Sequence, residues 1–192
     1  MGQPGSIIKR FTDIIISLIA LILTSPLLII AVIAIRFESK GGVFFSQERV
    51  GKNGKIFKIY KLRTMVFNAD KIGPVLTQLS DKRITKIGKL LRLTSLDEIP
   101  QMMNVLKGDM SIIGPRPEVP SIIKTYNTQQ LAVLDYQPGI TGIVQISGRA
   151  ALEIETKLKM DIEYYPNENF WSDFVIMAKT PFAILSNNGN VM

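Results

Sequence analysis

The chain has 192 residues, no cysteine, no histidine and a formal charge of +7 at neutral pH. The length suits one domain, and the missing residue types exclude disulfides, thiolate nucleophiles, Ser-His-Asp triads and the usual zinc sites. Any catalysis must therefore use carboxylates, Lys, Arg or hydroxyl groups, with an oxygen-preferring metal at most. The positive charge indicates an anionic partner, such as nucleic acid, an acidic membrane surface or a phosphate-bearing substrate.

The N-terminal fifth of the chain is strongly apolar. Residues 1–6 resemble a cloning remnant and are left out of the fold prediction. Residues 14–35 carry no charge, and 15 of these 22 residues are Ile, Leu or Val. Such a run favours insertion into a bilayer and is just long enough to cross a hydrocarbon core of about 30 Å. We therefore predict that residues 7–40 form a membrane helix.

Ser25 and Pro26 lie at the centre of this run. Proline removes one helical hydrogen bond, and a neighbouring Ser hydroxyl can satisfy the freed carbonyl and stabilise a bend. Basic residues flank the run at both ends, so charge gives no clear orientation. Two structures remain open on these residues: a kinked single-pass anchor, which the segment alone favours, and a helix that dips into the bilayer and returns.

The remainder predicts a mixed, mainly helical domain. Residues 43–63 read as a β-hairpin around Asn53-Gly54, with a basic second arm that also suits a solvated edge strand. Residues 81–93 have the pattern of a basic amphipathic helix, suited to an anionic bilayer, a phosphate site or simple solvation. Further helices are predicted at about 98–107, 118–134, 151–164 and 168–186. The last is rich in aromatic residues that suit either a core or a lipid interface. Residues 187–192 read as a tail.

Asp97 and Glu98 are the most suggestive acidic pair. They lie near a predicted helix start, where Ser95 and Glu98 would form a capping box or Asp97 would be the N-cap. Either position lies at the positive end of a helix and should keep the carboxylates ionised. Taken alone, the pair is explained well enough by capping.

Basic residues near this pair in the sequence favour phosphoryl chemistry. Arg92 precedes it, and Arg116 is fixed between two prolines. An arginine grips phosphate oxygens through its planar fork, and a carboxylate that attacks a phosphate needs its charge offset. A Gly-rich stretch ends at Arg149, a further candidate anion ligand, but matches neither a Walker loop nor a dinucleotide fingerprint.

Several motifs in order give the chain a recognisable pattern. It resembles the small monotopic polyprenol-phosphate phosphoglycosyl transferases of the bacterial sugar transferase family over about residues 7–186. The resemblance rests on Lys9-Arg10-Phe11-Thr12-Asp13, Ser25-Pro26, Phe57-Lys58-Ile59-Tyr60-Lys61-Leu62-Arg63-Thr64-Met65, Thr94-Ser95-Leu96-Asp97-Glu98, Asn104-Val105-Leu106-Lys107-Gly108-Asp109-Met110-Ser111, Gly114-Pro115-Arg116-Pro117, Pro138-Gly139-Ile140-Thr141-Gly142 and Asp161 with Tyr164-Tyr165.

The resemblance implies a reaction and assigns roles to residues. A sugar-1-phosphate would pass from a UDP-sugar to a polyprenol phosphate, such as undecaprenyl phosphate, with release of UMP. Asp97 would attack the donor and carry a covalent phosphosugar, Glu98 would deprotonate the lipid phosphate, and Mg²⁺ would bind at Asp97. Arg92 and Arg116 would bind phosphates. The break at Ser25-Pro26 would make the membrane helix re-entrant, which reverses the preference for a single pass.

Together these expectations describe an α+β, mostly α-helical monotopic membrane protein with a re-entrant helix, a small β-hairpin and interfacial amphipathic helices. Residues 41–186 would form the catalytic domain on the cytoplasmic face of the bacterial inner membrane, at the first membrane step of glycan assembly. The sugar and the oligomeric state are not readable, and a homo-oligomer stays open. The competing interpretation is a non-enzymatic membrane-anchored module that binds anionic lipid or nucleic acid. Nucleic acid is disfavoured because no recognition motif for it occurs.

Overall fold

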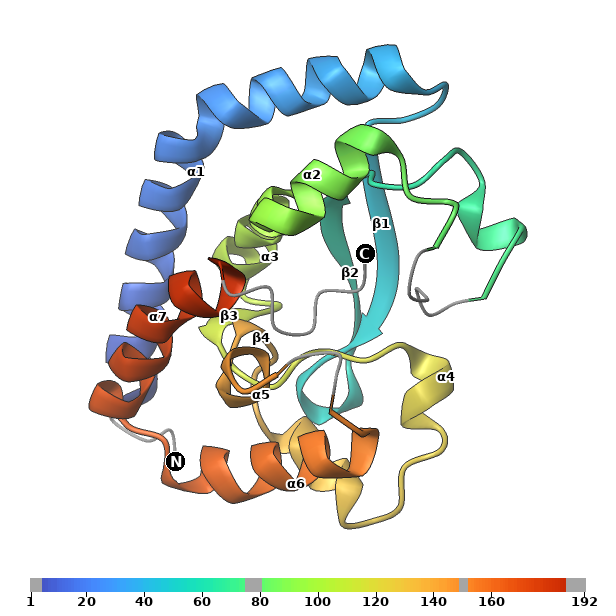
Figure 1. Cartoon of the computed structure of the whole chain (residues 1–192). Coiled ribbons are helices and arrows are strands. Elements are labelled where there is room, and N and C mark those ends of the chain that lie inside the picture. The colour runs from blue at the N-terminus through green and yellow to red at the C-terminus, as the bar shows by residue number, and fades with distance from the viewer. Residues whose placement is uncertain (1–4, 75–80, 149–151, 186–192) are drawn as a thin grey trace.

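The computed structural model describes residues 5–74, 81–148 and 152–185 (Figure 1). The helices are α1 (Gly5–Glu38), α2 (Lys86–Thr94), α3 (Met102–Lys107), α4 (Pro120–Ile123), α5 (Ile143–Ile146), α6 (Ile154–Tyr164) and α7 (Phe170–Leu185). The strands are β1 (Phe44–Val50), β2 (Ile56–Leu62), β3 (Ser111–Ile113) and β4 (Gly139–Thr141), and short 3-10 turns include η3 (Leu96–Gln101) and η4 (Gln130–Asp135). The predicted mostly helical α+β fold is confirmed.

Helix α1 is one continuous apolar helix of 34 residues with a sharp bend (Figure 1). Pro26 lies inside it and cannot donate to the carbonyl of Ile22, four residues earlier. The Ser25 hydroxyl donates to that same carbonyl at 2.8 Å. The predicted Ser-Pro bend is therefore confirmed, and the carbonyl that proline leaves free is satisfied within the helix.

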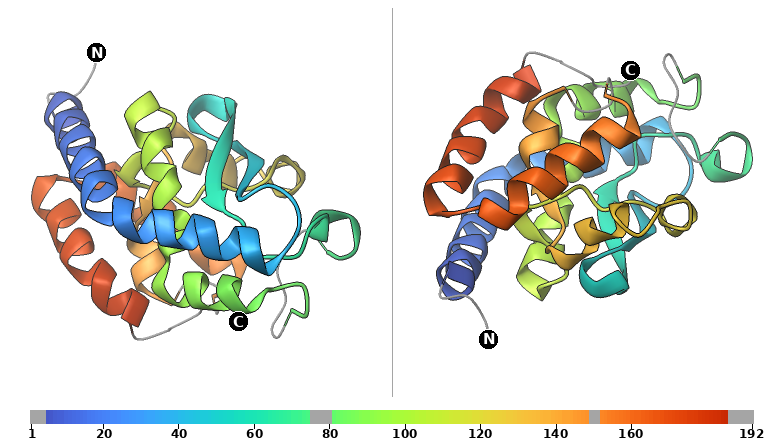
Figure 2. Two further views of the ribbon diagram at one scale, coloured as in Figure 1. Left: turned by 90° about the horizontal axis from the view of Figure 1, so that it is seen from above. Right: turned by 90° about the horizontal axis from the view of Figure 1, so that it is seen from below.

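The N-terminal half of α1 is fastened to the domain by polar contacts. Asp13 accepts a hydrogen bond from the backbone N–H of Ile112 at 3.0 Å, and Arg10 donates to the Leu106 carbonyl at the end of α3 at 2.8 Å. Lys9 forms ion pairs of 2.9 Å with Glu168 and with Asp173, beside and within α7. Figure 2 shows that α7 starts next to this half of α1.

The C-terminal half of α1 packs on the same domain through apolar contacts. Ala31 and Ile35 are buried in a cluster with Leu62 of β2 and Leu91 of α2. The rest of α1 is largely exposed and apolar, and its length and composition suffice to cross a membrane. Both halves of the bent helix therefore contact one folded unit, while an apolar surface remains without protein cover in the described residues.

The predicted hairpin is confirmed as an antiparallel pair, β1 with β2, in which Phe44 faces Leu62 and Val50 faces Ile56. Asn53 and Gly54 both have positive φ in the turn, as an Asn-Gly pair favours. A side chain of α3 covers part of the free edge of β2. The buried side chain of Asn104 donates to the Lys58 carbonyl at 2.7 Å and accepts from the Tyr60 N–H at 3.1 Å, so α3 is fixed against β2.

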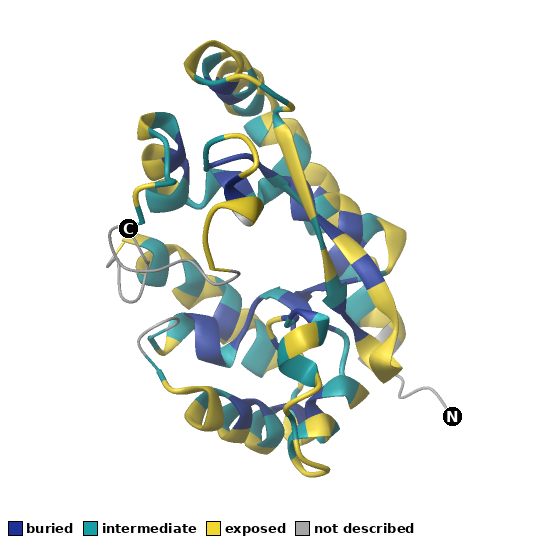
Figure 3. Ribbon diagram, turned by 90° about the vertical axis from the view of Figure 1, so that its right-hand side faces the viewer, coloured by how far each residue is buried: buried dark blue, intermediate teal, exposed yellow. Residues whose placement is uncertain are grey.

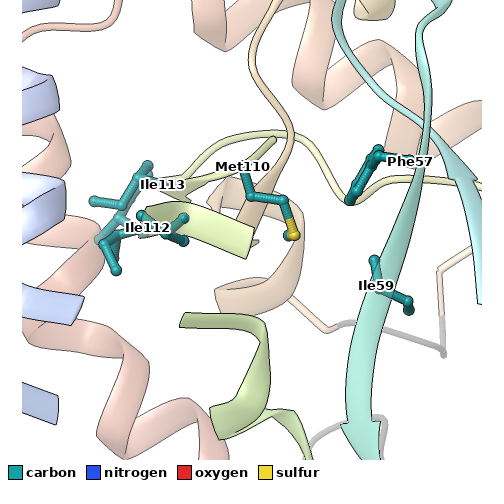
Figure 4. Packing of buried hydrophobic residues seen from close by; sticks show 7 residues of the cluster. Phe57, Ile59, Met110, Ile112 and Ile113 are labelled. Atoms are coloured by element: carbon teal, nitrogen blue, oxygen red, sulfur yellow. The ribbon is translucent and has the colours of Figure 1, made fainter. Parts of the chain in front are cut away.

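The main core lies between the hairpin and a second, parallel pair formed by β3 and β4. Phe57 and Ile59 of β2 pack toward Met110, Ile112 and Ile113 (Figure 4). Figure 3 shows the buried positions concentrated on the inward sides of the elements, with exposed positions on the outer turns. This core fixes β2, α3 and the segment between them, which carries the acidic pair.

Three predicted helices differ from the structure. The helix predicted at about 98–107 is α-helical only over Met102–Lys107, after the 3-10 turn η3. The helix predicted at 81–93 begins only at Lys86, because the Thr85 side chain caps it by accepting the Gly88 N–H. The continuous helix predicted at 118–134 is wrong: the segment forms the single-turn α4 and, separately, η4. Asn127 and Gln130 exchange two hydrogen bonds of 2.9 Å, each from the backbone N–H of one residue to the side-chain oxygen of the other. These bonds form a turn between α4 and η4 and keep the two as separate elements.

Candidate active site

Asp97 and Glu98 occupy the first turn of η3, directly after α2 ends at Thr94. Ser95 turns the chain with a left-handed φ of 55° and uses its backbone N–H, not its side chain, to close α2. The predicted capping box is wrong, since the Ser95 side chain makes no cap hydrogen bond and Glu98 reaches elsewhere. Asp97 is not the N-cap either. The two carboxylates are therefore not used as helix caps.

Glu98 is held by two cations. Its Oε1 accepts from Lys61 Nζ at 2.6 Å and from Arg116 Nη2 at 3.2 Å. Burial favours the neutral acid, but Lys61 and Arg116 outweigh it and hold the pKa of Glu98 well below its usual range. Glu98 is therefore an ionised carboxylate in this arrangement.

Asp97 has a different environment from its neighbour. It is only 8% exposed, and it makes no ion pair within 4 Å in the described parts of the chain. Burial, and next to it the charge of Glu98, raise the pKa of Asp97 to about 6, against the opposing attraction of Lys61 and Arg92. At neutral pH Asp97 is thus mostly ionised, as expected, but less stably so than Glu98 and with its oxygens free of cationic partners.

The predicted arginines surround the acidic pair. Arg92, in the last turn of α2, donates from Nε to the Thr64 hydroxyl at 2.9 Å, and burial lowers its pKa. The Arg116 side chain is 45% exposed, and Glu98 raises its pKa. Arg49 of β1 donates to the Pro117 carbonyl at 2.9 Å and so fixes the backbone next to Arg116. Burial and the neighbouring Arg116 lower the pKa of Arg49 to about 10.

These groups line a cavity of about 630 Å³. This volume lies within the range of about 300–1,000 Å³ that is usual for small-molecule sites. Around the acidic pair the lining includes Lys61, Arg92, Asp97, Glu98 and Arg116. The lining also includes residues of α5, of α6 and of the segment that contains α4 and η4, among them Gln145, Asp161 and Tyr126. The site thus combines two carboxylates of unequal pKa with several cations suited to phosphate groups.

Comparison with known proteins identifies the family of the chain. The family model described as bacterial sugar transferase matches residues 4–187. The chain belongs to the bacterial sugar transferase family. Among its relatives, exopolysaccharide production protein ExoY of Sinorhizobium fredii is 36% identical, over 97% of this chain and 89% of that protein. UDP-N-acetylgalactosamine-undecaprenyl-phosphate N-acetylgalactosaminephosphotransferase of Aeromonas hydrophila is 41% identical, over 95% of this chain but only 44% of that protein.

A relative from Caulobacter vibrioides is also similar. UDP-glucose:undecaprenyl-phosphate glucose-1-phosphate transferase of that organism is 36% identical, over 94% of this chain and 70% of that protein. The names of the Aeromonas hydrophila and Caulobacter vibrioides transferases specify different sugars. Membership of the sugar transferase family therefore indicates the class of reaction but does not identify the sugar of the donor.

The structure brings together four of the residues that the sequence singles out in this sugar transferase: Arg92, Asp97, Glu98 and Arg116. Arg149 lies outside the described residues. Lys61 and Arg49 were missed as site residues. The sequence shows Lys61 only as part of a basic strand, which is more often a solvated edge. Its place in the quoted motif around residues 57–65 is the signal that would have found it.

Proposed function

We propose that the chain transfers a sugar-1-phosphate from a UDP-sugar to a polyprenol phosphate, such as undecaprenyl phosphate, and releases UMP. One observation carries the proposal: a buried Asp97, which has no cation within ion-pair distance among the described residues, sits beside a cation-paired Glu98 in a cavity lined by Lys61, Arg92 and Arg116. The names of the relatives support it, since two of them describe phosphosugar transfer to undecaprenyl phosphate. The product would begin the assembly of a bacterial glycan.

In the first step, a carboxylate oxygen of Asp97 attacks the β-phosphorus of the donor. The bond between that phosphorus and the bridging oxygen breaks, UMP leaves with the electron pair, and the sugar-phosphoryl group is bound to Asp97. Asp97 suits this role because it is mostly ionised at neutral pH and forms no ion pair with the cations in the described part of the chain. Arg92 and Lys61 offset the negative charge that would otherwise oppose attack on a phosphate.

In the second step, an oxygen of the polyprenol phosphate attacks the same phosphorus and displaces the Asp97 carboxylate. Glu98 accepts the proton of the acceptor phosphate, which titrates near pH 6. Glu98 is a weak base while Lys61 and Arg116 both hold it. Arg116 is the more exposed of these two cations, with 45% of its side chain accessible against 16% for Lys61. Binding of substrate phosphate draws Arg116 away and restores basicity to Glu98.

Mg²⁺ fits this site as a cofactor shared with the substrate. No group of three or more metal-binding side chains occurs in the described residues, but Mg²⁺ is commonly held by one or two carboxylates together with substrate phosphates. Of the two carboxylates, Asp97 is the one that forms no ion pair in the described residues, and it would supply the protein ligand. The ion, when bound, neutralises charge on the phosphates.

The membrane arrangement that we propose is re-entrant. Both halves of α1 contact the same domain, the first through Asp13 and Arg10 and the second through Ala31 and Ile35. A helix that left the domain and crossed the bilayer could not return both ends to it. The exposed apolar face of α1, with that of α7, would then rest in one leaflet, on the cytoplasmic side of the inner membrane where UDP-sugars are made available.

Release of UMP tests the reaction. Purified full-length protein in detergent or vesicles, with undecaprenyl phosphate and Mg²⁺, should release UMP from at least one member of a panel of UDP-sugars. Asp97→Asn should reduce this release by about 10³-fold or more, since it removes the nucleophile. If no donor yields UMP, or if Asp97→Asn retains full activity, the proposed reaction is wrong. The alternative function, a non-enzymatic membrane-anchored binding module, is then favoured.

A further inference from the structure

The cavity has a second polar region that the phosphoryl chemistry leaves unused. One face of α6 lines it through Ile154, Lys157, Leu158 and Asp161, which follow the spacing of a helix side. Tyr126 and Gln145 line the cavity as well. None of these residues belongs to the group around Asp97. A nucleotide sugar is longer than its diphosphate, so a cavity that holds the phosphates at the acidic pair also has to accommodate the groups on either side.

Asp161 is the unusual member of this region. It is 5% exposed, and its Oδ1 has no hydrogen-bond partner in the described residues. No cation within ion-pair distance compensates it there, and Glu118, another cavity residue, adds a like charge that opposes its ionisation. A buried carboxyl oxygen without a hydrogen-bond partner is costly to a fold. Such a group at the wall of a cavity is explained if the ligand supplies the missing partner.

The geometry points to Asp161 as a donor-recognition residue, whose carboxylate accepts a hydrogen bond from an O–H or N–H group of the nucleotide sugar beyond its phosphates. This inference rests on the proposed function, because it assigns a role to a further lining residue of the same cavity. The donating group belongs either to the transferred sugar or to the nucleoside, and both offer the same chemistry to a carboxylate. Asp161 would set affinity and selectivity for the donor and take no part in the transfer itself.

The test compares Asp161→Asn and Asp161→Ala with the wild type in the full-length protein. We expect the KM for the UDP-sugar to rise about 10-fold or more, as loss of a hydrogen bond to a charged group implies. We expect kcat to change less than threefold and the KM for polyprenol phosphate to stay unchanged. The matched control is Glu163→Gln, which removes a charge from the solvent side of the same helix, where Glu163 is 66% exposed.

Two ligand arms identify the group that Asp161 recognises. If the nucleoside contacts it, the inhibition constant of UMP rises by the same factor as the donor KM. If the sugar contacts it, UMP inhibition is unchanged and the variants alter the ranking of UDP-sugar epimers. Either result supports the inference. An unchanged donor KM, or an equal loss of affinity for donor and acceptor, overturns it in favour of a structural role.

Thermal stabilisation by UDP-sugar in the absence of acceptor separates this inference from the proposed reaction. If the wild type is stabilised by a UDP-sugar and the Asp161 variants are not, while no transfer occurs, donor recognition stands and the reaction is wrong. If transfer occurs and the variants are stabilised like the wild type, the reaction stands and the role of Asp161 is wrong. If no UDP-sugar stabilises the wild type and none yields UMP, both are wrong.

Discussion

At the scale of single residues, the two adjacent carboxylates differ most in what holds them. Glu98 has Lys61 and Arg116 as partners, whereas Asp97 has none within ion-pair distance among the described residues. Adjacent side chains in one turn therefore differ in the way that the two proposed roles, nucleophile and base, require. The difference arises because Lys61 on β2 forms an ion pair with Glu98 and not with Asp97.

Glu98→Gln should separate the two steps. The variant keeps Asp97, so it should still release about one equivalent of UMP per enzyme in a burst, while turnover falls by about 10²-fold or more. Rapid-quench measurement of UMP reads both values. The control is Glu48→Gln on β1, which lies outside the cavity lining and should keep full turnover. Loss of the burst itself in Glu98→Gln would contradict the assignment of Glu98 to the second step.

Asp161 should make stability depend on pH near neutrality. Burial raises its pKa to about 7, from an ordinary value of 3.8. Between these values the folded chain keeps a proton that the unfolded chain has lost, so this contribution to stability falls as pH rises through 7. From pH 6 to pH 8 the free energy of unfolding of the wild type should drop by about 1 kcal/mol relative to Asp161→Asn. Denaturant unfolding at both pH values checks this, and parallel curves would contradict it.

At this scale the sequence predicts residue types better than their partners. Asp97, Glu98, Arg92 and Arg116 were all found from their chemistry and the quoted motifs. Lys61 and Asp161 were not assigned to the site, because the one reads as an edge-strand lysine and the other as a helix residue. Their roles depend on which long-range neighbour they meet, and neither local pattern nor charge specifies that.

At the scale of elements, tertiary packing explains why a glycine, Gly88, occupies a position inside α2. A glycine inside α2 lowers helix propensity by about 1 kcal/mol relative to alanine. In the folded chain, a Cβ at this position would lie 2.0 Å from the Thr64 carbonyl oxygen, so α2 approaches the segment after β2 more closely than any side chain permits. That approach brings Arg92 to the Thr64 hydroxyl.

Gly88→Ala should therefore destabilise the protein despite the better helix propensity of alanine. The clash is with backbone and cannot be relieved by a side-chain rotation, so we expect a loss of about 1–3 kcal/mol. Thermal unfolding in detergent measures it. Gly42→Ala is the matched control, since its nearest atom would be at 3.8 Å and it should be nearly neutral. Equal melting temperatures for the two variants would show that α2 can move away from Thr64.

Elements defined by local signals were predicted well, and those defined by tertiary contact were not. The hairpin follows from Asn53-Gly54, and the bend in α1 follows from Ser25-Pro26. The parallel pair of β3 with β4 was missed, because each strand has three residues and exists only through its partner. The helix predicted over 118–134 failed for the opposite reason: an apolar pattern continued across the turn that Asn127 and Gln130 close.

At the scale of the whole molecule, the folding back of α1 onto one domain predicts its topology. Because the chain has no native cysteine, single introduced cysteines report position without background. Ile7→Cys and Lys40→Cys should react with an impermeant maleimide from the same side of sealed vesicles. Lys159→Cys on exposed α6 marks the side of the catalytic domain and should react with them. Labelling of residue 7 from the opposite side would restore a single-pass anchor.

The ion pair between Lys9 and Glu168 joins positions 159 residues apart, and it has a consequence for the order in which the protein is made. At about 5–20 residues per second, a ribosome needs about 8–30 s to supply the partner after Lys9 has been synthesised. During that time Lys9 lacks its partner beside α7, although Leu106 and Ile112, the partners of Arg10 and Asp13, are made earlier. In the re-entrant arrangement that we propose, the apolar face of α1 can therefore enter the bilayer before α7 is fastened to the helix.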